Sequence, residues 1–213
     1  MDKKPLLFDF DGVIADTFHI AHGVAKKMCV FLTETEYKKT FEGNVYDSTK
    51  SFLNAADHGD RCDHTLDWWA EYAPGFKTHA RPFAQMPELI AAFAEEHAIS
   101  IVSSSHDDLI REFLASYGLT DAVEGVYGVD VDPHKDKKFK MIFEKYGVSA
   151  GDCLFVTDTL GDINEASSVG LKSIGVTWGF QDRPTLERGN PFVIVDSPDE
   201  LKATIERYFA AAQ

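Results

Sequence analysis

The sequence LLFDFDGVIADT at residues 6–17 combines a short apolar run with closely spaced aspartates and a glycine. We expect residues 6–10 to form a strand. Because residues i and i+2 of an extended chain point the same way, Asp9 and Asp11 can converge at its carboxyl end, the edge where open α/β sheets bind ligands. Gly12 lets the chain turn sharply away. The alternative is a solvated acidic strand end, although carboxylates flanked by apolar residues are costly to bury without a purpose.

Further short runs rich in β-forming residues follow along the chain. Amphipathic helical patterns lie between them, such as residues 109–117, which Gly118 ends, and residues 139–146, which Gly147 ends. Strands that alternate with helices indicate an α/β fold built on a Rossmann-like, doubly wound parallel sheet. The further predicted strands are residues 99–102, 126–129, 153–157, 173–177 and 192–195.

Residues 16–80 break this rhythm, because they show helical patterns and turn signals but no convincing strand. We predict an all-helical cap domain at residues 16–80, inserted after the first strand, with residues 1–15 and 81–213 forming the α/β core. The expected helices of the insert cover residues 19–32, 47–56 and 62–72, with breaks at Gly43, at residues 58–59 and at residues 74–75.

The composition is that of a globular protein with an acidic excess. Of the 213 residues, 44% are hydrophobic and 26% charged, and the formal net charge is −14 at pH 7. Such an excess repels nucleic acid and anionic membrane surfaces, so we expect neither as a partner. No run approaches the roughly 18 apolar residues of a membrane helix. An anionic substrate would have to be met locally, by a cation.

The cysteines and the amino terminus bear on the compartment. Cys29, Cys62 and Cys153 are odd in number and scattered, which predicts no disulfide framework and fits a reducing environment. Charges interrupt the first apolar stretch before a signal peptide could form. We therefore predict a cytoplasmic protein, and the sequence leaves open whether it is a monomer or a dimer.

A second pair of aspartates follows the predicted strand at residues 153–157. Asp158 stands at the strand end, and Asp162 lies near the start of the next helix. Carboxylates from two strand ends supply oxygen ligands that suit Mg²⁺, an ion that keeps water and shares its shell with a substrate phosphate. The alternative for Asp162 is a carboxylate that complements the helix dipole.

Hydroxyl and ammonium groups follow two other predicted strands. Ser103 and Ser104 come directly after residues 99–102, where hydroxyls and backbone amides can hold phosphate oxygens. Several lysines open a later helix, and we favour Lys135, which lies closest to the strand end, over Lys137. The alternatives are a turn or a helix cap for the serines and a solvated basic face for the lysines.

These four elements, in this order, resemble the haloacid-dehalogenase superfamily. Its phosphatases show Asp-x-Asp-Gly after the first strand, Ser or Thr after the second, Lys before a later helix and Asp-x-x-x-Asp after the fourth. The helical insert resembles the type 1 cap of the phosphoglycolate-phosphatase-like branch. Two positions depart from the pattern: Thr157 stands where many relatives have glycine, and no proline follows the lysine.

The resemblance implies a Mg²⁺-dependent phosphatase that hydrolyses a small phosphorylated metabolite through an aspartyl-phosphate. Asp9 would attack phosphorus, and Asp11 would protonate the leaving oxygen. Mg²⁺ would be held by Asp9, by Asp158 and by the backbone carbonyl of Asp11. Asp162 would order a metal-bound water or Lys135. The phosphate would be bound by Gly12, Ser103, Ser104 and Lys135.

Residues of the insert are candidates for substrate specificity. His19 lies close in sequence to the catalytic loop. The segment Glu42-Gly43-Asn44 resembles the cap loop that, in related enzymes, reaches into the active site and selects the leaving group. We therefore expect Glu42, Asn44 and Tyr46 to contribute to specificity, and a glycine-punctuated turn is the alternative.

Two other functions stay open at this stage. A phosphomutase of the same branch would protect the aspartyl-phosphate from water and return the phosphoryl group to its substrate. A non-catalytic, phospho-accepting or binding module comes from a different class, because receiver domains also combine strand-end aspartates with Ser/Thr and Lys. Asp11 argues against the module, and also against a dehalogenase, since a halide leaving group needs no proton. The insert argues against the module too, because a receiver has no use for a lid.

Overall fold

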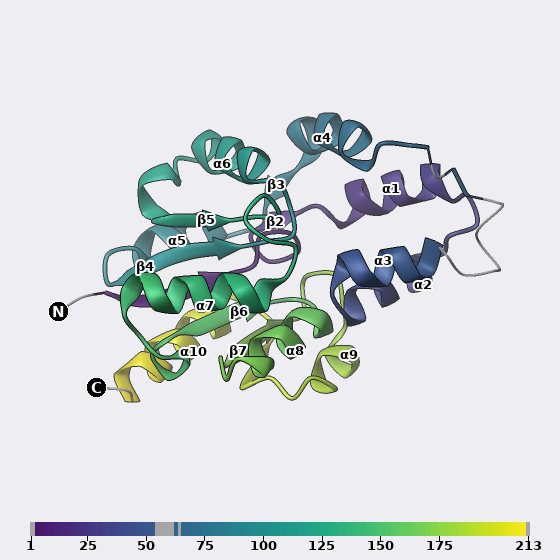
Figure 1. Ribbon diagram of the computed structural model, residues 1–213. Helices are drawn as coiled ribbons and strands as arrows, with labels where there is room; N and C mark the ends of the chain where they lie inside the picture. Colours follow the sequence, from purple (N-terminus) through teal and green to yellow (C-terminus); the bar gives the residue numbers. More distant parts are fainter. Residues whose placement is uncertain (1–2, 54–61, 64, 212–213) are drawn as a thin grey trace.

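The computed structural model describes residues 3–53, 62–63 and 65–211. Its centre is a six-stranded sheet in the order β5-β4-β1-β6-β7-β8 (Figure 1), in which every neighbouring pair is parallel. The predicted α/β fold is therefore confirmed, and each predicted strand differs from the observed one by two residues or fewer at either end. The strands are β1 (Lys4–Phe8), β4 (His97–Val102), β5 (Gly125–Tyr127), β6 (Leu154–Thr157), β7 (Ser173–Val176) and β8 (Val193–Val195).

Strand β1 lies inside the sheet because both of its faces are apolar. Leu6, Leu7 and Phe8 are completely buried. Phe8 pairs with Ile101 of β4 on one side and with Val156 of β6 on the other. The residues that follow these three strands consequently reach the same edge of the sheet. The strand order reverses at this point, as expected where open α/β sheets bind ligands.

Helices cover both faces of the sheet. Leu6 and Phe8 pack in one apolar cluster with helices α5, α6 and α10, whereas Leu7 packs in a second cluster with α7 and α8. This division follows from the alternation of side chains along a strand. The helices of the core are α5 (Met86–Phe93), α6 (Asp107–Ser116), α7 (Lys135–Tyr146), α8 (Leu160–Ser168), α9 (Arg183–Glu187) and α10 (Pro198–Ala211), with 3₁₀ turns η3 (Thr120–Ala122) and η4 (Ala150–Asp152).

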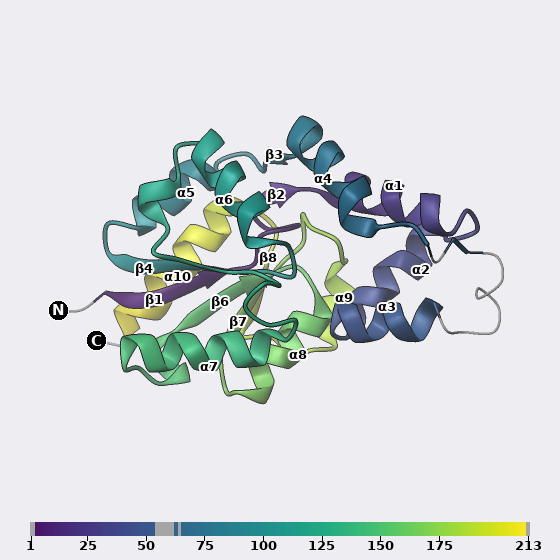
Figure 2. The same ribbon diagram turned by 45° about the horizontal axis from the view of Figure 1, so that its top comes forward.

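After β1 the chain leaves the sheet and forms helices that gather at one end of the molecule (Figures 1 and 2). A two-stranded antiparallel ribbon, β2 (Ala15–Asp16) with β3 (Arg81–Pro82), joins the start of this region to its end. The division into a cap and a core domain stays a prediction. The helices of this region are α1 (Phe18–Met28), α2 (Glu34–Lys39), α3 (Val45–Leu53) and α4 (Trp68–His79), with the 3₁₀ turn η1 (Thr40–Glu42).

The predicted break at residues 74–75 is wrong, because α4 continues through Pro74 and Gly75. The helix packs on α1 so closely that a Cβ at Gly75 would lie 3.1 Å from the side chain of Ile20. Tyr72 and Phe76 of this helix are buried, and the Phe76 ring contacts Phe10 and Phe113. This burial offsets the missing amide hydrogen of proline. None of the described helices has the length and apolar content of a membrane-spanning segment.

The other predicted bounds in this region are shifted. The last of the three predicted helices begins at Trp68 rather than at residue 62, because Asp67 caps α4 by accepting hydrogen bonds from the backbone of Trp69 and Ala70. The break expected at residues 58–59 and the end of the helix predicted over 47–56 lie outside the described residues.

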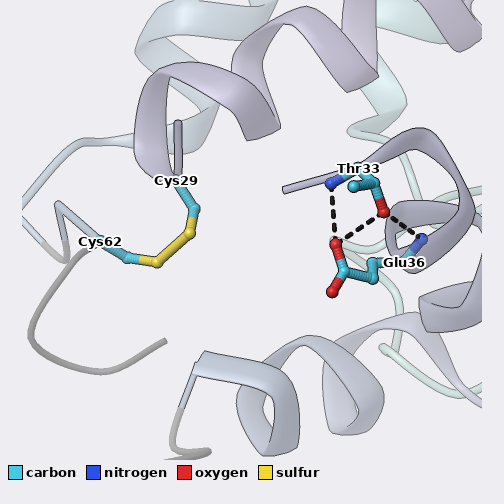
Figure 3. Close-up of a disulfide and its surroundings, with 4 residues drawn as sticks. All are labelled: Cys29, Thr33, Glu36 and Cys62. Atoms are coloured by element: carbon cyan, nitrogen blue, oxygen red, sulfur yellow. Dashed lines mark hydrogen bonds between the residues drawn. A yellow bond between two sulfur atoms is a disulfide. The ribbon is translucent and has the colours of Figure 1, made fainter. Parts of the chain in front are cut away.

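The prediction of no disulfide framework is wrong for one pair of cysteines, because Cys29 and Cys62 form a disulfide (Figure 3). The disulfide joins the end of α1 to the segment that precedes α4. These cysteines are 33 residues apart, and only the packing of the helices brings them together. Figure 3 also shows the Thr33–Glu36 capping box that begins α2. The remaining cysteine, Cys153, is free and buried.

Candidate active site

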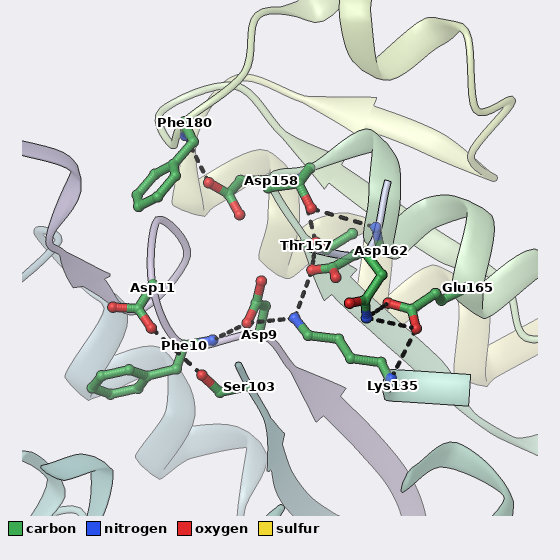
Figure 4. A network of polar contacts seen from close by, with 12 residues as sticks. Asp9, Phe10, Asp11, Ser103, Lys135, Thr157, Asp158, Asp162, Glu165 and Phe180 are labelled. Atoms are coloured by element: carbon green, nitrogen blue, oxygen red, sulfur yellow. Dashed lines mark hydrogen bonds and ion pairs between the residues drawn. The ribbon is translucent and has the colours of Figure 1, made fainter. Parts of the chain in front are cut away.

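The predicted site residues that directly follow β1, β4 and β6 meet at one edge of the sheet (Figure 4). They are Asp9, Ser103 and Asp158, and none is more than 5% exposed. Their proximity follows from the strand register, since the three strands are neighbours that end level with one another. The edge therefore carries two buried carboxylates and a buried hydroxyl.

Asp9 and Asp11 reach different surroundings, because the strand ends at Phe8 rather than at residue 10. The backbone amide of Asp9 still donates to Val156 of β6, and the Asp9 carboxylate accepts from the backbone of Phe10 at 2.7 Å. The turn that follows requires Gly12, whose φ is 77° and where a Cβ would overlap the Asp158 carboxylate. The structure thus places Gly12 against Asp158.

Lys135, the first residue of α7, joins two of the predicted carboxylates. Its Nζ lies 2.8 Å from Asp9 Oδ1 and 2.6 Å from Asp162 Oδ2, and its side chain is 2% exposed. Burial alone would lower the pKa of Lys135, but the carboxylates of Asp162 and Asp9 outweigh burial and raise it. By contrast, Lys137 is exposed and pairs with Asp132. The structure brings Lys135 into the site and leaves Lys137 outside it.

Asp158 has an unsatisfied carboxylate oxygen. Its Oδ2 accepts from the backbone of Phe180 at 2.6 Å, whereas its Oδ1 is buried and has no hydrogen-bond partner among the described residues. Burial raises the pKa of Asp158 to about 7. Burial also raises the pKa of Asp9 well above its ordinary value, although Lys135 lowers it. Asp9 and Asp158 are thus buried carboxylates with too few positive groups nearby to neutralise both of them. Such a pair is suited to a divalent cation.

The ligand set that the protein offers fits Mg²⁺ in particular. No three His, Cys, Asp or Glu side chains within the described ranges form a complete metal-binding cluster. Mg²⁺ typically takes one or two carboxylates and fills the rest of its shell with water and substrate phosphate. Asp9 and Asp158 offer carboxylate oxygens of that kind.

Asp162 is held between Lys135 and Thr157. Its Oδ2 accepts a hydrogen bond from Thr157 Oγ1 at 2.8 Å as well as from Lys135. Burial alone would raise the pKa of Asp162, but Lys135 and these hydrogen bonds lower it below its ordinary value. Asp162 lies in the first turn of α8, so the expected interaction with the helix dipole applies too. Thr157, the departure from the family pattern, thus anchors the carboxylate that faces Lys135.

Asp11 is surrounded by hydroxyl donors. Its Oδ1 accepts from Thr17 at 2.8 Å and from Tyr72 at 3.0 Å, and its Oδ2 accepts from Ser105 at 2.7 Å and from Ser103 at 3.5 Å. Burial and the adjacent Asp11 raise the pKa of Tyr72, so its phenol stays protonated and donates. Sequence reasoning missed Thr17, Ser105 and Tyr72. Three serines in succession at residues 103–105 are the signal that could have identified Ser105, but nothing in the sequence pointed to Tyr72.

A second buried lysine supports the loop after β4. Lys138 Nζ donates to the backbone carbonyl of Ser103 at 2.6 Å, and its side chain is completely buried. Burial, followed by the charge of Lys135, lowers the pKa of Lys138 to about 8. Sequence reasoning missed this residue, although the i, i+3 spacing of the two lysines places them on one face of a helix.

The loop before α3 is fastened to the core near Lys135. Glu165 of α8 accepts a hydrogen bond from the backbone amide of Lys135 at 3.0 Å and another from Asn44 Nδ2 at 3.3 Å. Asn44 also donates to the carbonyl of Pro133 at 3.1 Å. Glu165, which sequence reasoning did not identify, therefore links the loop before α3 to the first residue of α7.

The specificity candidates reach different places. Tyr46 donates to the carbonyl of Ser104 at 2.6 Å and lines a cavity of about 600 Å³. The same cavity is lined by Asp9 and Asp11 and by residues of α1, α3 and α4. Glu42 instead pairs with Arg188 at 2.7 Å, and His19 is exposed beside Asp16. The structure brings Tyr46 to this cavity, whereas Asn44, Glu42 and His19 are not among its described lining residues.

Comparisons with known proteins agree with this arrangement. The chain is 27% identical to a phosphoglycolate phosphatase of Pectobacterium atrosepticum over 59% of this chain and 55% of that protein. The chain is also 23% identical to a phosphoglycolate phosphatase of Mesorhizobium japonicum, over 100% of this chain and 99% of that protein. A crystal structure of a predicted phosphatase from Clostridium acetobutylicum shares the fold, with a TM-score of 0.79 and 20% identity over 97% of this chain and 100% of that one.

A family-wide comparison covers most of the chain. The sequence model of one family, described as haloacid dehalogenase-like hydrolase, matches residues 6–176. The matched range begins in β1 and ends with β7, so it includes the aspartates, serines and lysine described above. The chain therefore belongs to the haloacid dehalogenase-like hydrolase family.

Proposed function

We propose that this protein is a Mg²⁺-dependent phosphatase that hydrolyses a small phosphate monoester through an aspartyl-phosphate intermediate. The observation that carries the proposal is the buried Asp9 carboxylate, which Lys135 contacts at 2.8 Å beside the unsatisfied oxygen of Asp158. A catalytic carboxylate in this setting can act as a nucleophile toward phosphorus. The phosphatase names of the relatives support the same reaction class.

In the first step, an oxygen of Asp9 attacks the phosphorus atom, and the bond between phosphorus and the ester oxygen breaks. The leaving oxygen takes a proton from Asp11, which enters the step protonated. The products are a free alcohol, a phosphoryl group bonded to Asp9 and an Asp11 carboxylate. Hydrogen bonds from Thr17, Tyr72 and Ser105 stabilise that carboxylate as it forms.

In the second step, a water molecule attacks the same phosphorus atom and passes a proton to the Asp11 carboxylate. The bond between phosphorus and Asp9 breaks, which releases inorganic phosphate. Asp9 is again a carboxylate and Asp11 is again protonated, so the enzyme returns to its starting state. One residue thus acts as acid and then as base.

The other residues hold the phosphate and balance its charge. Lys135 and Ser103 would contact the equatorial oxygens, with further contacts from Gly12 and Ser104. Asp162 keeps the Lys135 ammonium group in place. Mg²⁺ would be held by Asp9, Asp158 and the backbone carbonyl of Asp11, where it would offset the repulsion between carboxylate and phosphate.

The test is inorganic phosphate release from sugar phosphates, nucleotides, phosphoglycolate and p-nitrophenyl phosphate. We expect many turnovers with Mg²⁺, loss of activity in EDTA, and a fall of about 10⁴-fold or more in kcat for Asp9→Asn. Asp16→Asn is the matched control, because Asp16 of β2 is an exposed aspartate near Asp9 in the sequence. Equal activity of wild type and Asp9→Asn, or of Mg²⁺ and EDTA samples, would contradict the proposal. Release of less than one phosphate per enzyme would favour a phosphomutase or a phospho-accepting module instead.

A further inference from the structure

The cavity next to Asp9 is much larger than the phosphate that the core residues would bind. Its volume is about 600 Å³, whereas sites that enclose drug-sized ligands run from about 300 to 1,000 Å³. A leaving group of two carbon atoms, such as glycolate, would fill only a small part of this space. The size of the cavity points to a larger leaving group.

Part of the cavity wall is aromatic. Trp68, Trp69 and Tyr72 of α4 line it together with Tyr37 and Phe41. The rings of Trp68 and Tyr72 are stacked, with an angle of 16° between their planes, and both tryptophans are only partly buried. Trp69 packs on His106 of the core, with ring centroids 4.3 Å apart. Fixed aromatic faces of this kind favour a flat ring as their partner.

The charges that line the cavity disfavour an anionic leaving group. Lys135 is already engaged by Asp9 and Asp162. Among the described lining residues Lys50 is the one other cation, and its side chain is exposed. The lining also includes the carboxylates of Asp11 and Glu165. A second anionic group on the substrate would therefore be buried without a cation committed to it, which is costly.

From these observations we infer that the natural substrate is a phosphate monoester whose leaving group carries an uncharged aromatic ring, bound between α4 and the loop before α3. The inference rests on the proposed function, because it assigns the phosphate to Asp9 and Lys135. Tyr72 connects the two parts of the site, since its hydroxyl contacts Asp11 while its ring stacks on Trp68. The acid that protonates the leaving oxygen thus lies beside the ring-binding wall.

The test compares esters of three primary alcohols, so that chemical reactivity is similar and binding makes the difference. The substrates are 2-phenylethyl phosphate, ethyl phosphate and phosphoglycolate, assayed by phosphate release. We expect kcat/KM for 2-phenylethyl phosphate to exceed that for either of the others by about tenfold or more. A wild-type preference for phosphoglycolate or ethyl phosphate would overturn the inference.

Variants locate the preference on the aromatic wall. Trp68→Leu is expected to reduce the ratio of kcat/KM between 2-phenylethyl and ethyl phosphate by about fivefold or more. Phe31→Leu is the matched control, because Phe31 is an aromatic residue of the same region that is 57% exposed and is not among the described lining residues. A ratio that Trp68→Leu leaves unchanged would contradict the assignment.

A binding measurement separates the failure of this inference from failure of the proposed function. Asp9→Asn protein is titrated with 2-phenylethyl phosphate and with ethyl phosphate while tryptophan fluorescence is recorded. We expect 2-phenylethyl phosphate to quench the tryptophan fluorescence in a saturable way, and ethyl phosphate not to do so. If hydrolysis depends on Asp9 but neither assay distinguishes the two esters, the ring assignment is wrong and the phosphatase assignment stands. If no ester is hydrolysed, the phosphatase assignment fails, and the titration alone decides the ring assignment.

Discussion

Two parts of the cavity lining are built from different side chains. At the sheet edge, Asp9, Lys135 and Asp162 form a chain of ion pairs that is almost completely buried. Elsewhere in the lining, Trp68 and Trp69 present partly buried rings that carry no charge. Fixed charges suit the charge that develops on a phosphoryl group, whereas rings discriminate by shape and apolar area. The contrast indicates that reaction chemistry and substrate choice are separable in this protein.

Hydrogen bonds connect the helical region between β2 and β3 to the sheet edge. Tyr72 of α4 donates to Asp11, and Asn44 of the cap loop donates to Glu165, which in turn holds the backbone of Lys135. A change at the sheet edge should therefore affect hydrolysis of every ester, whereas a change on the aromatic wall should alter the ranking of esters.

The largest effect is expected for Lys135→Met. Removal of this ammonium group leaves the buried carboxylates of Asp9 and Asp162 without a counterion, which costs about 3–5 kcal/mol of unfolding free energy. Activity should fall by about 10³-fold or more. Urea unfolding and phosphate release measure the two effects. Lys137→Met is the matched control and should change little, because Lys137 is exposed; similar losses in both variants would contradict the assignment.

Asp11→Asn should show an effect that depends on the leaving group. For alkyl phosphates, which need a proton on the leaving oxygen, we expect release of the alcohol to slow by about 10²–10⁴-fold. For p-nitrophenyl phosphate the loss should be smaller, because that leaving group departs without a proton. Single-turnover release of each alcohol, with enzyme in excess, is the measurement. Equal losses for both ester types would argue against Asp11 as the acid.

Mg²⁺ should stabilise the protein more at pH 8 than at pH 6. Asp158 has a pKa of about 7 in the folded protein, against about 4 when unfolded. A raised folded pKa gives a contribution to stability that is complete below pH 4 and is lost as the pH rises through 7. Mg²⁺ binds the ionised carboxylate, so saturating Mg²⁺ should raise Tm by about 5 °C at pH 8 and by less at pH 6. Equal Tm values with Mg²⁺ and EDTA at both pH values would rule out this site.

The smallest effect is expected for Thr157→Val, which removes one of the two hydrogen bonds that Asp162 Oδ2 accepts from side chains but keeps the side-chain shape. A hydrogen bond to a charged group is worth about 1.5–3 kcal/mol, so we expect a loss of about that size in urea unfolding. Thr78→Val provides the comparison, since the Thr78 hydroxyl bonds a backbone carbonyl on an exposed part of α4. If the two variants have the same free energy of unfolding, the hydrogen bond from Thr157 to Asp162 does not stabilise the protein.

The fold was predictable because its signals are local. Leu6, Leu7 and Phe8 are apolar in succession, as a central strand of a parallel sheet requires, and glycines end α6 and α7 where expected. The helical region between β2 and β3 was less predictable. Pro74 ordinarily indicates the end of a helix, but packing of α4 on α1 overrides that preference.

The residues of the candidate site also fall into two groups, those that the sequence predicts and those that it does not. Asp9, Ser103 and Asp158 could be predicted because each directly follows a recognisable strand, and parallel strands bring their carboxyl ends together. Tyr72 could not, because its contact with Asp11 spans 61 residues and depends on how α4 lies across the core. Lys138 was overlooked because a lysine in a basic stretch ordinarily faces solvent. The disulfide between Cys29 and Cys62 could not be predicted either, because the two cysteines are 33 residues apart and meet only through the packing of the helices.

The proposal that Asp9 is the nucleophile is tested most directly by finding the phosphoryl group on the protein. Asp11→Asn protein, which should hydrolyse its intermediate slowly, is mixed with Mg²⁺ and p-nitrophenyl phosphate, quenched in acid and digested for mass spectrometry. The predicted result is one phosphoryl group on the peptide that carries Asp9. The double variant Asp9→Asn/Asp11→Asn should carry no phosphoryl group on that peptide. A phosphoryl group on Ser103 or another side chain, or phosphate release with no modified peptide, would contradict the account.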